Sequence, residues 1–344
     1  MGRNEISAAA PSQSAAPSRW KRLLPGILIS LAALAGLFSV IDLRQTLDAF
    51  RQADRTCLVL GICGSLLWLV LRGKVWQTLL QGKASYRDVF LTLNEGYLLN
   101  NLLPFRLGEV GRAYLLGRKA GLGFWQVLPS VLLERIFDLA LAVGLFVCTL
   151  PFVAGVGWAA QAAALTGGIV ALGLLGIYLL AHNRPRVTAW LERLGQRWPL
   201  VQRLTGGRVA AFFSGLGIIT DPRLFLRALG WLLLNWALSV LVYGIFLRAF
   251  FSPVPALWAV FVLGAGSLGI AAPSSPGAVG VFEAALVAAL AVFKVDPSQA
   301  TAFAITLHLS NYLTTGLIGG FALLREGETL SSLYARLGRL KDEK

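Results

Sequence analysis

The stretch Asn-Asn-Leu-Leu-Pro-Phe-Arg-Leu-Gly-Glu-Val-Gly, residues 100–111, decides how the rest of the chain is interpreted. It places a proline, two glycines, a cation and an anion inside a chain otherwise built of apolar runs. A second break, Ala-Pro-Ser-Ser-Pro-Gly-Ala-Val-Gly-Val-Phe-Glu, occupies residues 272–283. In both, a proline precedes a glycine by four residues and a glutamate follows: Pro104, Gly108 and Glu109, then Pro276, Gly280 and Glu283. Two such breaks predict an internal repeat.

The composition indicates an integral membrane protein. Of the 344 residues, 56% are hydrophobic and 14% are charged, whereas about a quarter are charged in soluble domains. The net charge of +14 is read as lysine and arginine in cytoplasmic loops, so no nucleic-acid partner is expected. Two histidines and three cysteines without paired ligand spacing predict neither a metal site nor a cofactor.

Six apolar segments approach the roughly 20 residues that a helix needs to cross a bilayer. They are residues 23–41, 56–80, 126–153, 158–180, 228–250 and 300–324. Two more apolar stretches, 89–116 and 258–293, are interrupted by the breaks, and their arms are too short to span. The charges on their flanks predict that each enters and leaves by one face, as a re-entrant hairpin. The expected fold is an all-α polytopic membrane protein with about six spans and two re-entrant helical hairpins.

Charge sets the predicted orientation and the domain boundaries. Residues 182–227 carry eight arginines and two acids, which predicts a cytoplasmic connection touching anionic lipid headgroups. Both termini then lie in the cytoplasm, and the expected location is the plasma membrane. Residues 1–19 are predicted to be a disordered tail, 20–325 the transmembrane domain, and 326–344 a cytoplasmic tail.

The order span, inner hairpin, span over residues 56–153 resembles the order span, outer hairpin, span over 228–324, turned upside down. Inverted repeats with broken helices at matching positions point to the midplane binding site of a transporter. The alternative is that two Pro/Gly-rich stretches match by chance. Helices that restart after a break expose N–H donors and partial positive charge, which suit a phosphate or carboxylate. We expect these restarts near Leu107–Gly108 and near Gly277.

The candidate substrate-binding residues are polar groups at membrane depth, which usually face a bundle interior or water. They are Asn101, Arg106, Glu109, Arg112, Glu134, Arg135, Asp138, Ser275 and Glu283, while Pro104, Gly108, Pro276, Gly277 and Gly280 form the hairpin breaks. One interpretation makes the three arginines a cationic site for a lipid headgroup, since guanidinium groups bind two phosphate oxygens at once. Another makes the charges structural ion pairs, and both stay open. Glu283 is a hydrogen-bonded, a proton-coupled or a headgroup-binding carboxyl group.

Three motifs in order resemble a known family. They are Asn-x-x-Pro-x-Arg-x-Gly-Glu-x-x-Arg at residues 101–112, Glu-Arg-x-x-Asp at 134–138, and Pro-Gly-x-x-Gly-x-x-Glu at 276–283. Over about residues 20–325 the chain is similar to the flippase-like transmembrane domain of lysylphosphatidylglycerol synthases (multiple peptide resistance factors) and their stand-alone relatives. The resemblance implies a lipid-translocation fold with two opposed hairpins. Because the sequence ends soon after the last span, the family's aminoacyl-transferase domain and lipid aminoacylation are not expected.

The sequence thus predicts a flippase-like transporter, not an enzyme, with no catalytic residues. Its expected partner is a membrane lipid with a polar, phosphate-bearing or lipid-linked headgroup held between the hairpins, and a homo-oligomer is possible. The alternatives are a membrane glycosyltransferase acting on polyprenyl-phosphate-linked sugars and a scaffold that binds lipid without moving it. No Asp-x-Asp motif supports the glycosyltransferase.

Overall fold

The computed structural model describes residues 19–103, 106–154, 159–197, 207–271 and 274–326, and within these ranges all regular structure is helical. The first half holds α1 (Arg19–Phe38), α2 (Leu43–Gln52), α3 (Arg55–Leu79), α4 (Tyr86–Leu102), α5 (Leu107–Lys119) and α6 (Phe124–Ala154). The connection holds α7 (Ala159–His182), α8 (Arg184–Arg197), α10 (Gly207–Gly215) and the 3₁₀ turn η2 (Leu216–Ile219). The second half holds α11 (Pro222–Phe250), α12 (Ala256–Ala271), the 3₁₀ turn η3 (Pro276–Ala278), α13 (Val281–Ala291) and α14 (Pro297–Arg325).

The six predicted spans coincide with the six long helices α1, α3, α6, α7, α11 and α14. Among the described residues, α3, α6 and α11 are long and apolar enough to cross a membrane, and α1 with α2 gives a fourth if that pair, bent by 85°, counts as one. Large apolar side chains lie on the outside: Phe152 is 77% and Leu317 72% exposed. Such a surface fits contact with lipid, and the chain is a multi-pass membrane protein; six complete spans stay a prediction.

Helix starts follow from an aspartate at the N-cap. The carboxylates of Asp42, Asp54, Asp221 and Asp296 each accept two backbone N–H bonds at the start of α2, α3, α11 and α14. Such caps satisfy donors that no helical carbonyl can reach. Proline at the first position of α11 and α14 has no N–H to satisfy. These boundaries are therefore fixed by local sequence.

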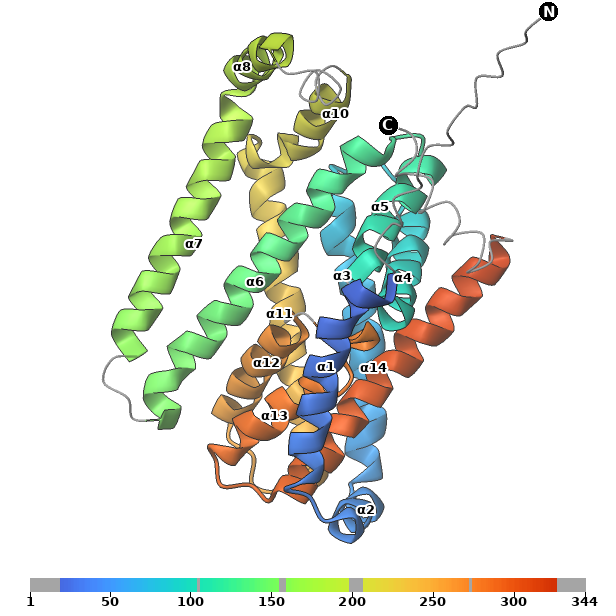
Figure 1. Cartoon of the computed structure of the whole chain (residues 1–344), viewed down its shortest axis with the longest axis vertical. Coiled ribbons are helices and arrows are strands. Elements are labelled where there is room, and N and C mark those ends of the chain that lie inside the picture. The colour runs from blue at the N-terminus through green and yellow to red at the C-terminus, as the bar shows by residue number, and fades with distance from the viewer. Residues whose placement is uncertain (1–18, 104–105, 155–158, 198–206, 272–273, 327–344) are drawn as a thin grey trace, which may run out of the picture.

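Antiparallel helix pairs occupy the two stretches in which re-entrant hairpins were predicted. Helices α4 and α5 have 17 and 13 residues, and α12 and α13 have 16 and 11. At 1.5 Å per residue, the longest of them is about 25 Å, less than the roughly 30 Å of a hydrocarbon core. Figure 1 shows α4–α5 in the upper half of the molecule and α12–α13 in the lower half, with their turns pointing toward each other. Entry from opposite leaflets stays a prediction.

The packing of the two halves is matched pair by pair. Helix α3 packs on α11, α4 on α14, and α6 on α12. Within the halves, α4–α5 corresponds to α12–α13, and α5–α6 to α13–α14. One apolar core joins α3–α6 with α10, η2 and α11; a second joins α11–α14. Helix α11 contributes to both cores, so it holds the halves together.

Part of the connection between the halves packs into the first apolar core. Residues 198–206, which follow α8, lie outside the described part. Downstream, α10 and η2 pack against α6 and α11 and bury Phe213, Leu216 and Ile218. Residues 207–219 therefore contribute to the first core, and contact of the connection with anionic headgroups stays a prediction.

Candidate functional site

The tips of the two hairpins meet in the middle of the molecule. The Arg106 guanidinium, just before α5, donates a hydrogen bond of 2.6 Å to the Ile270 carbonyl near the end of α12. Asn101, near the end of α4, donates through Nδ2 to the Thr315 hydroxyl of α14 at 3.1 Å. Helix α4 also packs against η3. Pro104 lies outside the described residues, but Asn101 before it and Arg106 after it contact the second half.

Glycines allow the close approach at both tips. A side chain at Gly108 would overlap the Gly96 carbonyl, so α4 and α5 cross with their backbones in contact. Gly277 has φ of +68°, and a side chain there would overlap the Tyr312 hydroxyl. Only glycine adopts such a conformation without cost. The predicted roles of these two residues as break points therefore have a steric reason.

Glu134 is the centre of an ion-pair network within the first half. Its side chain is fully buried, and Oε1 lies 2.6 Å from Nη2 of Arg72, 3.0 Å from Nη2 of Arg112 and 2.6 Å from Nη2 of Arg135. Arg112 also lies over the Trp76 ring, with 4.7 Å between its Cζ and the ring centroid. A carboxylate can be buried in this way because several cations and their hydrogen bonds replace water.

Two further carboxylates complete the network. Glu109 lies 2.6 Å from Arg112 and 3.5 Å from Arg135. Asp138 pairs with Arg72 and Arg135, and it accepts a hydrogen bond of 3.2 Å from the indole of Trp236 on α11. Arg72 and Trp236 were not among the residues predicted for the site. Arg72 lies eighteenth in the 25 residues of α3, within the segment 56–80 that was predicted to span the membrane, and an arginine at that place is the signal that could have identified it.

The network carries more positive than negative charge. Four arginines (72, 106, 112 and 135) accompany three carboxylates (109, 134 and 138), which gives a net charge of +1. Arg106 lies close enough to Arg135, Glu109 and Asp138 to interact with them electrostatically, but within the described part of the chain it forms no ion pair. The side chain of Arg135 is 30% exposed, whereas that of Arg112 is 1% exposed. The network thus has a buried side, Arg72 and Arg112, and a more accessible side, Arg106 and Arg135.

The backbone of Arg106 has an unusual conformation. It adopts φ of +52° and ψ of +39°, in the left-handed region, immediately before the first residue of α5. A side chain in this region costs about 1–2 kcal/mol, and such strain is concentrated at functional sites. Helix α5 begins at Leu107, as predicted, so its N–H donors lie beside this guanidinium.

The second hairpin carries a different polar group. Glu283 Oε2 accepts the backbone N–H of Gly280 at 2.7 Å, and its Oε1 lies 2.5 Å from Nδ1 of His308 on α14. Nε2 of His308 lies 3.0 Å from the Gly277 carbonyl. Helix α13 begins at Val281, so the predicted start near Gly277 is wrong by four residues. At the start of α13, the carboxylate of Glu283 accepts the N–H of Gly280.

The predicted site residues therefore form two groups. Arg106, Glu109, Arg112, Glu134, Arg135 and Asp138 share the network, and Asn101 lies at the tip beside it. Glu283 belongs to the second group with His308. Ser275 points its backbone N–H at the Ser30 hydroxyl of α1 at 3.0 Å, a contact with a helix outside the repeat. Their use in substrate binding stays a prediction.

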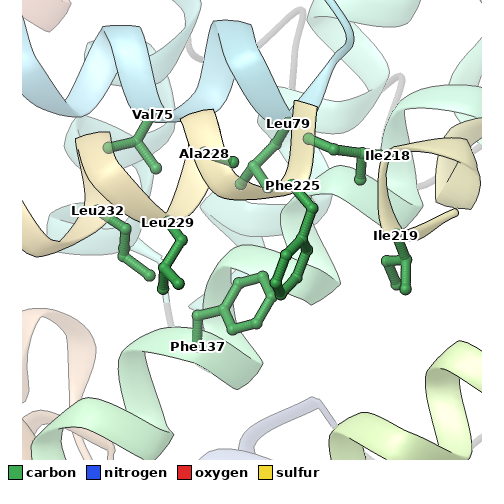
Figure 2. Close-up of a pocket in the computed structure, with 9 residues that line it drawn as sticks. All are labelled: Val75, Leu79, Phe137, Ile218, Ile219, Phe225, Ala228, Leu229 and Leu232. Atoms are coloured by element: carbon green, nitrogen blue, oxygen red, sulfur yellow. The ribbon is translucent and has the colours of Figure 1, made fainter. Parts of the chain in front are cut away.

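A separate, small pocket lies between α3, α6, α11 and η2. Figure 2 shows its lining, which is apolar throughout: Val75, Leu79, Phe137, Ile218, Ile219, Phe225, Ala228, Leu229 and Leu232. None of the predicted site residues lines it, and it offers no polar group to a charged headgroup.

The chain belongs to the family described as the lysylphosphatidylglycerol synthase TM region, which it matches over residues 24–319. Two similar curated proteins come from archaea. Glycosyltransferase AglD of Haloferax volcanii is 24% identical over 357 residues, which cover 93% of this chain and 57% of AglD. The UPF0104 membrane protein MJ1078 of Methanocaldococcus jannaschii is 27% identical over 227 residues, 64% of this chain and 91% of that protein. The chain thus spans little more than half the length of AglD. No solved structure matches.

Proposed function

We propose that this protein moves a lipid with a phosphate-bearing headgroup between the two leaflets of the plasma membrane. The headgroup binds where the hairpin tips meet, beside Arg106 and Arg135, while the hydrocarbon chains stay in lipid. The observation that carries the proposal is the net charge of +1 in the network. An unneutralised cation at membrane depth is costly, and an anionic ligand removes that cost.

The matched packing of the two halves supports a transporter. In an inverted repeat the contact of α4 with α14 becomes the contact of α12 with α6 when the halves are exchanged, and both contacts are present. Transporters of this kind expose their midplane site alternately to each side by rocking one repeat against the other. The hydrogen bonds of Arg106 and Asn101 to the second half lie at the boundary that such a movement opens.

The buried arginines have a different task from the accessible ones. Arg72 and Arg112 are enclosed and paired with carboxylates, so they hold α3, α5 and α6 together. Among the described residues, the Arg106 guanidinium has one hydrogen-bond partner, the Ile270 carbonyl. A phosphate can replace that carbonyl, because a charge-assisted hydrogen bond is stronger. Both earlier interpretations, headgroup site and structural clamp, therefore apply, each to its own side of the network.

The test is leaflet exchange of fluorescent lipids in proteoliposomes, followed by quenching from outside. Wild-type protein is expected to exchange phosphate-bearing lipids faster than protein-free liposomes of the same composition do. Arg106→Gln keeps a donor for the Ile270 carbonyl but removes the charge, and it is expected to slow exchange of the phosphate lipids about tenfold or more, equivalent to about 1.4 kcal/mol.

The matched control is Arg44→Gln on α2, which changes an exposed arginine of the same formal charge. It is expected to exchange lipid at the wild-type rate. Undiminished exchange by Arg106→Gln would remove the proposed headgroup site, and binding of lipid without any exchange by the wild type would favour a scaffold.

The Haloferax relative is named a glycosyltransferase, which supports sugar transfer as a second candidate function; the sugar carrier that we propose for it is a polyprenyl phosphate. The same cationic tip suits a polyprenyl phosphate headgroup. Incubation of the purified protein with a polyprenyl-phosphate sugar and an acceptor lipid separates the two. Sugar transfer by the purified chain would replace translocation as the proposed function.

A further inference from the structure

We infer that Glu283 and His308 form a proton-binding site that couples lipid movement to a proton gradient. This inference rests on the proposed function for the coupling, but the proton site itself is argued from geometry alone. Both side chains are nearly buried, each about 10% exposed. They link the outer hairpin to α14, on the side of the molecule away from the arginine network.

The hydrogen-bond partners fix the number of protons in the pair. The Gly277 carbonyl can only accept, so Nε2 of His308 carries a hydrogen at that 3.0 Å contact. Nδ1 and the Glu283 oxygen are 2.5 Å apart, and a second proton must lie between them, because two lone pairs at this distance repel. The pair is therefore imidazolium with carboxylate or imidazole with carboxylic acid. Either form is neutral overall and holds one proton more than imidazole with carboxylate.

The surroundings leave this proton to the pair alone. Helices α12 and η3 contain no titratable side chain, and α13 contains only Glu283. Helix α1 faces the start of α13 with Ser30 and Leu34, and α4 faces η3 with the carbonyl of Asn101. On α14 the neighbour is Tyr312, whose ring lies 4.6 Å from that of His308. No cation other than His308 is placed to neutralise Glu283 among these contacts, so gain or loss of the proton changes the charge of the whole group.

Loss of the proton releases the tip of the outer hairpin. Without it, one proton remains on the imidazole ring. If that proton lies between Nδ1 and Glu283, Nε2 presents a lone pair to the Gly277 carbonyl; if it lies on Nε2, the carboxylate faces the lone pair of Nδ1 and the ring turns away. Either outcome gives up the bond to Gly277, which lies at the tip against Asn101 of the inner hairpin and Tyr312. A proton taken from water on one side holds the tip closed; its release to the other side opens the tip. One proton then moves with each opening and closing of the site.

Hydrogen–deuterium exchange in nanodiscs tests the proton site without any lipid transport. Backbone amides of residues 277–283 are expected to lose protection as pH rises in the wild type, beyond the intrinsic rise in exchange rate. Glu283→Gln imitates the protonated acid, because its amide can donate to Nδ1 while its oxygen accepts from Gly280, and it is expected to stay protected at high pH. His182→Gln changes the other histidine and is expected to follow the wild type. Protection that does not depend on pH in the wild type would overturn the proton site.

Proteoliposomes with a clamped membrane potential test the coupling. If one proton accompanies one lipid, a difference of one pH unit can shift the leaflet ratio of the labelled phosphate lipid by up to about tenfold. The wild type is expected to approach this ratio, and His308→Gln is expected to give equal leaflets. Rapid exchange by the wild type with equal leaflets would overturn the coupling. Absence of exchange under every condition would overturn the proposed function and the coupling, while the amide-exchange result would still decide on the proton site.

Discussion

The inner and outer hairpins have a similar backbone plan and opposite chemistry. The inner hairpin, α4–α5, is tied to α3 and α6 by arginines and carboxylates. In the outer hairpin, Glu283 is the one charged residue of α12 and α13, and its partners are one backbone N–H and one histidine. Repeat architecture therefore fixes where the chain turns, and it leaves each tip free to carry its own chemistry. The inner tip suits an anion, and the outer tip suits a proton.

The largest expected effect comes from removing a buried charge of the inner hairpin. Arg72→Gln leaves Glu134 and Asp138 short of a cation, and breaking a buried pair in this way costs about 3–5 kcal/mol. We expect a clear fall in the thermal unfolding midpoint in detergent and a lower yield of folded protein. Arg55→Gln, at the exposed start of the same helix, is the control and is expected to match the wild type. Equal midpoints for Arg72→Gln and wild type would mean that the network does not hold the inner hairpin.

An intermediate effect is expected from adding a methyl group at either tip, and the two tips differ in whether it can be rescued. Gly277→Ala meets the Tyr312 side chain, so the second change Tyr312→Leu is expected to restore part of the stability. About 1–2 kcal/mol of loss remains, because alanine is strained at positive φ. Gly108→Ala meets the Gly96 carbonyl, which no side-chain change removes. Thermal unfolding of the single and double variants measures both.

The control for these variants is Gly316→Ala on α14, where an added methyl group meets nothing within 4 Å. It is expected to unfold at the wild-type temperature. Failure of Tyr312→Leu to improve Gly277→Ala would place the steric limit of the outer tip elsewhere.

The smallest expected effect is at the hydrogen bond that ties the inner tip to α14. Thr315→Val keeps the shape of the side chain and removes the acceptor of Asn101. Hydrogen bonds between membrane helices average about 0.6 kcal/mol, so a small fall in unfolding free energy is expected. Thr306→Val removes a hydroxyl that bonds only within α14 and serves as the matched control. A larger loss for Thr306→Val than for Thr315→Val would contradict the role given to this bond.

Much of the fold was accessible from the sequence because it depends on local signals. Apolar length placed the six long helices, and the break residues placed both hairpins and the start of α5. The boundaries of α11 and α14 follow from an aspartate and a proline. The start of α13 was predicted wrongly because the Glu283 carboxylate accepts the N–H of Gly280. The positions of glycine and proline alone do not predict this contact.

The site was accessible only in part, because its contacts join residues far apart in the chain. Glu109, Arg112, Glu134, Arg135 and Asp138 are joined by ion pairs, and their use in substrate binding stays a prediction. Arg72 was not predicted as a site residue because its partner Glu134 lies 62 positions away and its position within α3 was not considered. The contact between Glu283 and His308 depends on the packing of α13 against α14, which no sequence motif predicts.

The bond between Arg106 and the Ile270 carbonyl has a consequence for the end of α12. The last four carbonyls of a helix lack partners inside the helix, and Ile270 is next to last in α12. Its carbonyl is instead satisfied by a guanidinium 164 positions earlier in the chain, so one half of the protein supplies the C-terminal cap of a helix in the other. If a phosphate binds Arg106 as proposed, α12 loses this cap, and we expect the last turn of α12 to fray when the ligand binds.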